Sequence, residues 1–194
     1  NLSSGWNWIS LNIENSESMS INNLFANSEL SNSDYIKSQT GSSTYYSSGG
    51  VWYPDWNMDL KSLYLLDLSE ETSILYQGNY SYPSEIEIPI ATGWNWISYT
   101  PTTSSDINTA LALFTPSNQD YIKSQTSSST YYSSGGVWYP DITLQPTKGY
   151  MLSASIEQSL FYPDIESNPS ENNLLLSNHY EQRNSFWDCH IKTF

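Results

Sequence analysis

The sequence DYIKSQTGSSTYYSSGGVWYPD at residues 34–55 decides the fold, because nearly the same string, DYIKSQTSSSTYYSSGGVWYPD, returns at residues 120–141. Among these 22 positions only one differs, where Ser127 takes the place of Gly41. Self-similarity at a fixed, long spacing is typical of repeated structural units. The sequence therefore predicts two consecutive copies of one small fold.

The duplication extends beyond this block. A shorter string, GWNWIS, occupies residues 5–10 and returns at residues 93–98, and weaker matches follow the block in both copies. We therefore predict one repeat at 1–86 and a second at 87–164. The segments between the two motifs differ far more than the block does. Either constraint has kept the block nearly identical or gene conversion has refreshed it, and we favour constraint.

The second half of the block predicts a β-hairpin. The strings TYY and VWY flank SSGG, and aromatic and β-branched residues favour strands while glycine accepts the positive φ of a tight turn. Successive strand residues point to opposite faces. We expect Tyr46 and Trp52 to point into the core, and Tyr45 and Tyr53 to point outward.

The other elements of a repeat follow from shorter patterns. GWNWIS predicts a strand that is covered on both faces, with its tryptophans in the core. In the second copy, one helical stripe is expected, capped by Ser104 or Ser105, with apolar residues at Ile107, Ala110, Leu111 and Phe114. Closing strands are expected near 148–152 and 160–162. The predicted fold class is mainly β (α+β), with two tandem repeats of antiparallel sheet, each with one short helix.

Composition narrows the function. The chain has 20 acidic and 6 basic residues and a net charge of −14, so it lacks the cations that bind nucleic acid or an anionic membrane surface. No apolar run reaches the length of about 20 residues that spans a bilayer. One cysteine, Cys189, excludes an internal disulfide framework and is compatible with secretion by a bacterium. Residues 165–194 are predicted to be a linker and the start of a following domain.

The order of these motifs resembles a repeat module of large secreted or cell-surface proteins from Bacteroidetes-type and other marine bacteria. In the second copy GWNWIS is followed by an amphipathic helix, DYIKSQT, an aromatic hairpin and PTKGYML. The first copy departs from this pattern, with LKSL at residues 60–63 where the second has PTKG at 146–149, so its fifth strand is less certain. The resemblance implies an extracellular or cell-surface location and no defined chemistry.

Catalytic patterns are missing from the sequence. There is no nucleophile elbow, phosphate-binding loop, or Cys/His metal spacing, and we expect neither an enzyme nor a cofactor. Asp34 and Asp55, with their copies Asp120 and Asp141, could form a pair of catalytic carboxylates. A structural role of these residues in turns is the favoured alternative.

Lys37 and Lys123 stand out because cations are scarce. Each follows an aspartate of the block by three residues, which predicts a salt pair at the edge of a strand. An isopeptide bond to an Asn or Asp side chain is the more speculative alternative.

The aromatic residues of the hairpins are the best candidates for binding. Exposed rings beside Ser, Asn and Asp suit stacking on sugars or contact with a protein, whereas packing in the core is the simpler alternative. We select as candidate ligand-binding residues Tyr45, Tyr53, Asp55, Trp56, Tyr131, Tyr139 and Asp141. The leading hypothesis is a non-catalytic adhesion, presentation or structural unit that meets a surface glycan or a protein partner and self-associates through its repeats. The alternative is a carbohydrate-binding module.

Overall fold

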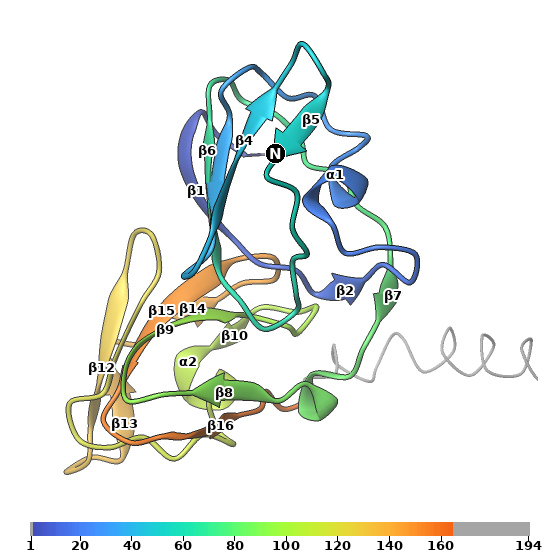
Figure 1. The fold of residues 1–194 in the computed structure, drawn as a ribbon. Coiled ribbons are helices and arrows are strands. Elements are labelled where there is room, and N and C mark those ends of the chain that lie inside the picture. Colours follow the sequence, from blue (N-terminus) through green and yellow to red (C-terminus); the bar gives the residue numbers. More distant parts are fainter. Residues whose placement is uncertain (1, 165–194) are drawn as a thin grey trace, which may run out of the picture. The chain divides into compact units, whose positions relative to one another are not determined.

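Each repeat forms a five-stranded antiparallel sheet, and the strand order is the same in both (Figure 1). The computed structural model describes residues 2–164, so the predicted linker and following domain lie outside the described residues. In the first repeat the order is β1-β6-β3-β4-β5, and the strands are β1 (Gly5–Ile9), β3 (Tyr35–Lys37), β4 (Ser42–Tyr46), β5 (Val51–Tyr53) and β6 (Tyr64–Leu68). In the second repeat the order is β9-β15-β11-β12-β13, and the strands are β9 (Gly93–Ser98), β11 (Tyr121–Lys123), β12 (Ser128–Tyr132), β13 (Val137–Tyr139) and β15 (Gly149–Ala154).

Short elements complete each repeat. Three two-stranded sheets join β2 (Ile13–Glu14) to β7 (Asn79–Tyr80), β8 (Ile88–Ile90) to β16 (Gln158–Leu160), and β10 (Ser105–Asp106) to β14 (Thr143–Leu144). The helices are α1 (Ile21–Leu24), α2 (Ile107–Ala110) and the 3-10 turn η1 (Pro83–Glu85). The prediction of a mainly β fold with one short α-helix in each repeat is confirmed for the described residues.

The predicted helix is shorter than its apolar stripe suggested. Helix α2 is a single turn that ends before Leu111, and its N-cap is Asp106 rather than Ser104 or Ser105. The Asp106 carboxylate accepts a hydrogen bond from the backbone N–H of Thr109 at 2.9 Å. A hydrogen bond from the Thr109 side chain, and then this backbone bond, lower the pKa of Asp106 below its ordinary value. Ser20 caps helix α1 in the same way.

The hairpin prediction is confirmed, but the orientation of two tyrosines was wrong. Tyr46 pairs with Val51, so Tyr45 stands opposite Trp52 and shares its face of the sheet. The rings of Tyr45 and Trp52 lie 5.5 Å apart on the core side, whereas Tyr46 and Tyr53 point outward. Register decides this, because shifting the pairing by one residue moves every side chain to the other face.

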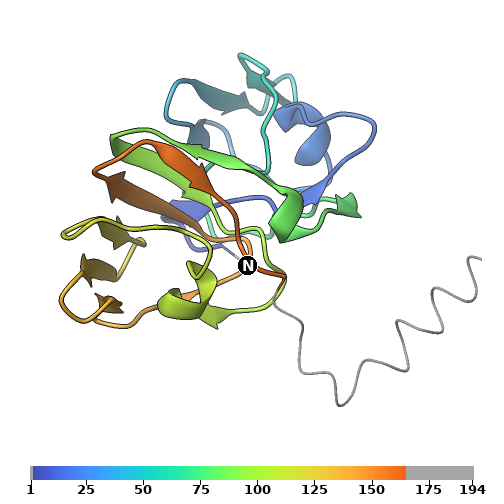
Figure 2. The same cartoon turned by 90° about the horizontal axis from the view of Figure 1, so that it is seen from below.

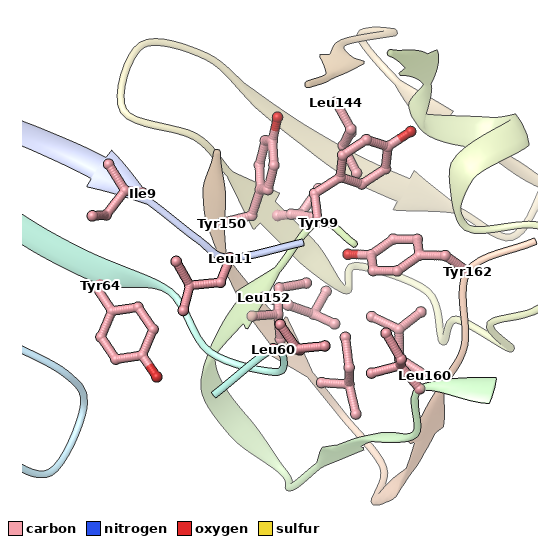
Figure 3. Packing of buried hydrophobic residues seen from close by; sticks show 14 of the residues in the cluster. Ile9, Leu11, Leu60, Tyr64, Tyr99, Leu144, Tyr150, Leu152, Leu160 and Tyr162 are labelled. Carbon is pink, nitrogen blue, oxygen red and sulfur yellow. The ribbon is translucent and has the colours of Figure 1, made fainter. Parts of the chain in front are cut away.

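One hydrophobic core runs through both repeats (Figure 3). Ile9 and Leu11 from the first repeat belong to the same buried cluster as Leu152 from the second. The Tyr99 ring packs edge-on against Tyr162, with 5.1 Å between their centroids. Residues 2–164 therefore fold as one compact unit. Its two hairpins, β4–β5 and β12–β13, lie at opposite ends (Figures 1 and 2).

Candidate functional site

Two glutamines of the duplicated block join the repeats reciprocally. The side-chain amide of Gln125 donates to the Trp6 carbonyl at 2.6 Å and accepts from the Trp8 N–H at 3.2 Å. In the same way Gln39 donates to the Trp94 carbonyl at 3.1 Å and accepts from the N–H of Trp96 at 3.2 Å. Each side-chain amide thus makes the kind of hydrogen bonds that a neighbouring strand would make with the edge strand of the other repeat, which is β1 for Gln125 and β9 for Gln39. An edge strand that would otherwise be open to pairing is closed in this way.

The two lysines of the block lie between tryptophans of both repeats. The Lys37 Nζ is 5.2 Å from the ring centroid of Trp6 in its own repeat and 5.9 Å from that of Trp96 in the other. Lys123 repeats the arrangement, with Nζ 5.0 Å from the Trp94 ring and 5.9 Å from the Trp8 ring. These are cation–π distances, worth about 0.5–1 kcal/mol each where solvent is present.

These contacts correct two predictions. Within residues 2–164 neither lysine forms the expected ion pair, and the partners of both are rings. The tryptophans are not core residues, since Trp6 is 43% and Trp94 is 49% exposed. Asn7 and Asn95 occupy the inward positions between them, where their amides bind nearby backbone carbonyls. Alternation along the strand then places both tryptophans of each GWNWIS string on the other face, beside the partner repeat.

Backbone contacts continue this interface. The N–H of Ser10 donates to the Thr147 carbonyl at 2.9 Å, and the N–H of Ser98 donates to the Lys61 carbonyl at 3.1 Å. Leu63 and Gly149 occupy equivalent positions in the two repeats and meet here. A Cβ placed on Gly149 would lie 2.8 Å from the Leu63 Cβ, closer than real Cβ contacts. A glycine in one repeat therefore makes room for a leucine in the other.

The other edge of each sheet is also closed by an amide. Asn22 beside β5 donates to the Trp52 carbonyl at 3.0 Å and accepts from the Trp52 N–H at 2.7 Å. Asn108 binds Trp138 through the same two bonds, at 3.3 and 2.8 Å. Both edges of the large sheets are therefore bridged by side chains from outside the sheet.

The buried aspartates of the block hold loops together. Asp120 is 1% exposed, and its carboxylate accepts from the backbone N–H groups of Ser117 and Ser155, both at 2.8 Å, and from the Ser155 hydroxyl at 2.6 Å. Asp34 makes the matching backbone contacts in the first repeat. Asp55, by contrast, is exposed and accepts from the N–H of Asn22. Asp34 and Asp55 thus have separate partners, and each has a structural contact.

The outward side of each hairpin is an apolar face, which we call the hairpin face. In the first repeat it consists of Tyr46, Val51 and Tyr53, and Tyr53 is 70% exposed. In the second repeat it consists of Tyr132, Val137 and Tyr139, and Tyr139 is 66% exposed. Rings that are open to this degree are available to a partner.

The remaining candidate residues lie in different surroundings. Tyr45 and Tyr131 are partly buried against Trp52 and Trp138 and do not join the hairpin faces. Asp55 and Asp141 are exposed. Trp56 is partly buried, and its ring lies 5.6 Å from that of Tyr64. The structure thus groups Tyr53 with Tyr46 and Val51 on one hairpin face, and Tyr139 with Tyr132 and Val137 on the other. These four neighbours were not among the selected residues.

Comparisons with family models, curated proteins and solved structures found no match. The site is therefore interpreted from its own geometry. Within residues 2–164 no group of three or more His, Cys, Asp or Glu side chains is placed to hold a metal ion. No helix in this part of the chain is both long enough and apolar enough to cross a membrane.

Proposed function

We propose that the chain is a non-catalytic structural unit of an extracellular or cell-surface protein, and that it presents two copies of one adhesive face. The observation that carries this proposal is the reciprocal interface. Gln39 and Gln125 bind across it and a common core runs beneath it, so the two hairpin faces are held at fixed positions. A rigid connection lowers the entropy that is lost when both faces bind at once.

The duplicated block supports this proposal through its contacts. Its lysine and glutamine hold the repeats together, its aspartate ties loops within a repeat, and its hairpin carries the exposed tyrosine. The same 22-residue sequence thus provides both the contacts that join the repeats and the exposed hairpin face. Preservation of the string in both copies is expected if both tasks are required of each repeat.

Binding to surfaces coated with protein or with polysaccharide tests the proposal. We expect Tyr53→Ser and Tyr139→Ser each to weaken adhesion of the full chain, and the double variant to abolish it. Because two linked sites gain avidity, one lost face should lower the apparent affinity by about 10²-fold or more. Tyr80→Ser with Tyr82→Ser is the matched control, since both rings are exposed outside the hairpins. Equal adhesion of the double variant and wild type would contradict the proposal.

A carbohydrate-binding module is the second candidate. The observation that favours it is the exposure of Tyr53 beside the hydroxyl-rich strand β4, since a ring face beside hydroxyl groups suits a sugar. Glycan-array binding that is lost in Tyr53→Ala with Tyr139→Ala, while the fold persists, would support it. Adhesion to protein-coated surfaces alone would favour the first candidate.

A further inference from the structure

Each repeat contains a cleft at the same place. One side is the SQT loop, at residues 38–40 or 124–126, and the other is the chain that leads into β6 or β15. The first-repeat cleft has a volume of about 530 Å³, and its lining includes Gln39, Thr40, Trp56, Asn57, Asp59 and Tyr64. The second-repeat cleft has a volume of about 430 Å³, and its lining includes Gln125, Thr126, Thr143, Gln145, Lys148 and Tyr150, together with Trp8 from the first repeat. Five of these residues correspond at the spacing of the duplicated block: Gln39, Thr40, Asn57, Asp59 and Tyr64 match Gln125, Thr126, Thr143, Gln145 and Tyr150.

One wall of the clefts is constant and the other varies. The SQT loop is the same in both repeats and is fixed by the glutamine that bridges to the other repeat. On the facing wall Asn57 becomes Thr143, Asp59 becomes Gln145 and Ser62 becomes Lys148. The position of Trp56 is taken by Ile142, which is buried. The two clefts therefore have the same SQT loop on one side and different side chains on the other.

The floor of the first-repeat cleft is the partly exposed ring of Trp56, which packs on the buried ring of Tyr64. Trp56 and Tyr64 lie 5.6 Å apart with 30° between their ring planes. The indole Nε1 of Trp56 is buried and has no hydrogen-bond partner among the described residues, so the exposed part of this side chain is ring carbon. Such a surface takes an apolar face of a ligand, for example the C–H side of a sugar ring.

Polar groups surround this floor. Asp59 is exposed; its Oδ1 accepts a backbone hydrogen bond from the N–H of Lys61, and its carboxylate also interacts with the Tyr64 hydroxyl. A carboxylate has about four acceptor sites, so acceptor capacity remains for a ligand. Within residues 2–164 the side chains of Thr40 and Asn57 have no hydrogen-bond partner. Asp59 is the only charged side chain among the residues that line the cleft, and it is an acceptor for hydroxyl donors that would repel an anionic ligand.

We propose that the first-repeat cleft binds a neutral hexopyranose unit of a glycan, with the ring stacked on Trp56 and its hydroxyls bonded to Asp59, Asn57 and Thr40. The second-repeat cleft has Ile142 and Gln145 at the positions of Trp56 and Asp59 and adds the cation Lys148; its one indole, Trp8, comes from the first repeat and lies at a different position. It therefore does not bind the same ligand. This site is separate from the hairpin faces. The unit acts as a scaffold whether or not the cleft is occupied.

Calorimetric titration of the full chain with neutral hexasaccharides tests the inference. The probes are β-1,4-glucan, β-1,3-glucan, α-1,4-glucan and β-1,4-mannan oligomers, with a sulfated oligosaccharide as the charged comparison. We expect at least one neutral probe to bind one site per chain and the sulfated probe not to bind. Trp56→Ile should lower the affinity at least about tenfold, as should Asp59→Gln. The second repeat already folds with Ile142 and Gln145 at these positions, so both variants suit the fold.

A matched variant separates this site from the hairpin faces. Tyr53→Ala with Tyr139→Ala should leave the cleft affinity unchanged while it weakens surface adhesion. Absence of binding to every neutral probe would overturn the inference, and so would equal affinities of Trp56→Ile and wild type. Loss of binding in the hairpin variant alone would assign the sugar to the hairpin faces instead.

Discussion

Replacing Gly149 tests the contact at the centre of the interface. A Cβ at this position would lie 2.8 Å from the Leu63 Cβ and 3.0 Å from the Ile9 carbonyl oxygen, and both neighbours belong to the other repeat. Either the leucine or the backbone must move. Overpacking a well-filled site in this way costs about 1–3 kcal/mol. We therefore expect Gly149→Ala to lower the free energy of unfolding of the full chain by that amount.

Denaturant titration with a double-mutant cycle gives the assay. In a Leu63→Gly background the side-chain clash is gone, so adding Gly149→Ala should cost much less than in the wild type. Exchanging the two residues, with Leu63→Gly and Gly149→Leu, should recover stability relative to Gly149→Leu alone because the positions are equivalent. Gly41→Ser is the control and should change stability by less than about 0.5 kcal/mol, since the second repeat carries Ser127 there. If Gly149→Ala costs the same in both backgrounds, contact with Leu63 is not the cause.

Three further predictions concern single residues. Asn108→Ala removes both bonds to Trp138 and should lower stability by about 1–3 kcal/mol, with faster hydrogen exchange of the Trp138 amide as the measurement. Asp120→Ala leaves the N–H groups of Ser117 and Ser155 without their acceptor and should cost at least about 2 kcal/mol in denaturant unfolding. Burial raises the pKa of Tyr150 from 10.0 to about 12, so above pH 10 the unfolded state binds fewer protons than the folded state. Stability should fall as the pH rises from 10 to 12, by up to about 3 kcal/mol, and alkaline unfolding of a Tyr150→Phe variant should be shallower.

The sequence predicted the elements because local signals determine them. The hairpin follows from two aromatic strings and from the glycine pair between them. The second glycine of the pair adopts a positive φ in each repeat, 63° at Gly50 and 65° at Gly136. The orientation of Tyr45 did not follow, because it depends on the pairing register, and an alternating pattern does not set the register by itself. Tertiary pairing of Tyr46 with Val51 decided it.

The roles of Lys37 and Gln39 were missed for a different reason. Lys37 lies in the predicted strand and Gln39 in the loop after it, but Trp96, one of the two rings beside Lys37, and Trp94, which Gln39 binds, belong to the other repeat. Period-two alternation shows that a strand has two faces, and it does not show what covers the second. One signal was present, since the identity of the two blocks extends past the hairpin into the IKSQT string.

The departure of the first repeat at residues 60–63 also has a structural reason. It suggested that the fifth strand was uncertain, yet β6 forms at Tyr64–Leu68 and pairs with both β1 and β3. The changed residue, Leu63, fills the space that Gly149 leaves open. A difference between the repeats is thus part of their fit.

Site-resolved hydrogen exchange under increasing denaturant tests most directly whether the two repeats are one cooperative unit. The probes are amides in the central strands β3 and β11, each of which pairs with strands on both sides. If the reciprocal contacts unite the repeats, both strands open with the same free energy, and Gln39→Ala with Gln125→Ala lowers the two values together. Two separate opening free energies, with the double variant changing neither, would mean that each repeat is stable by itself and that the shared block does not act as a joint.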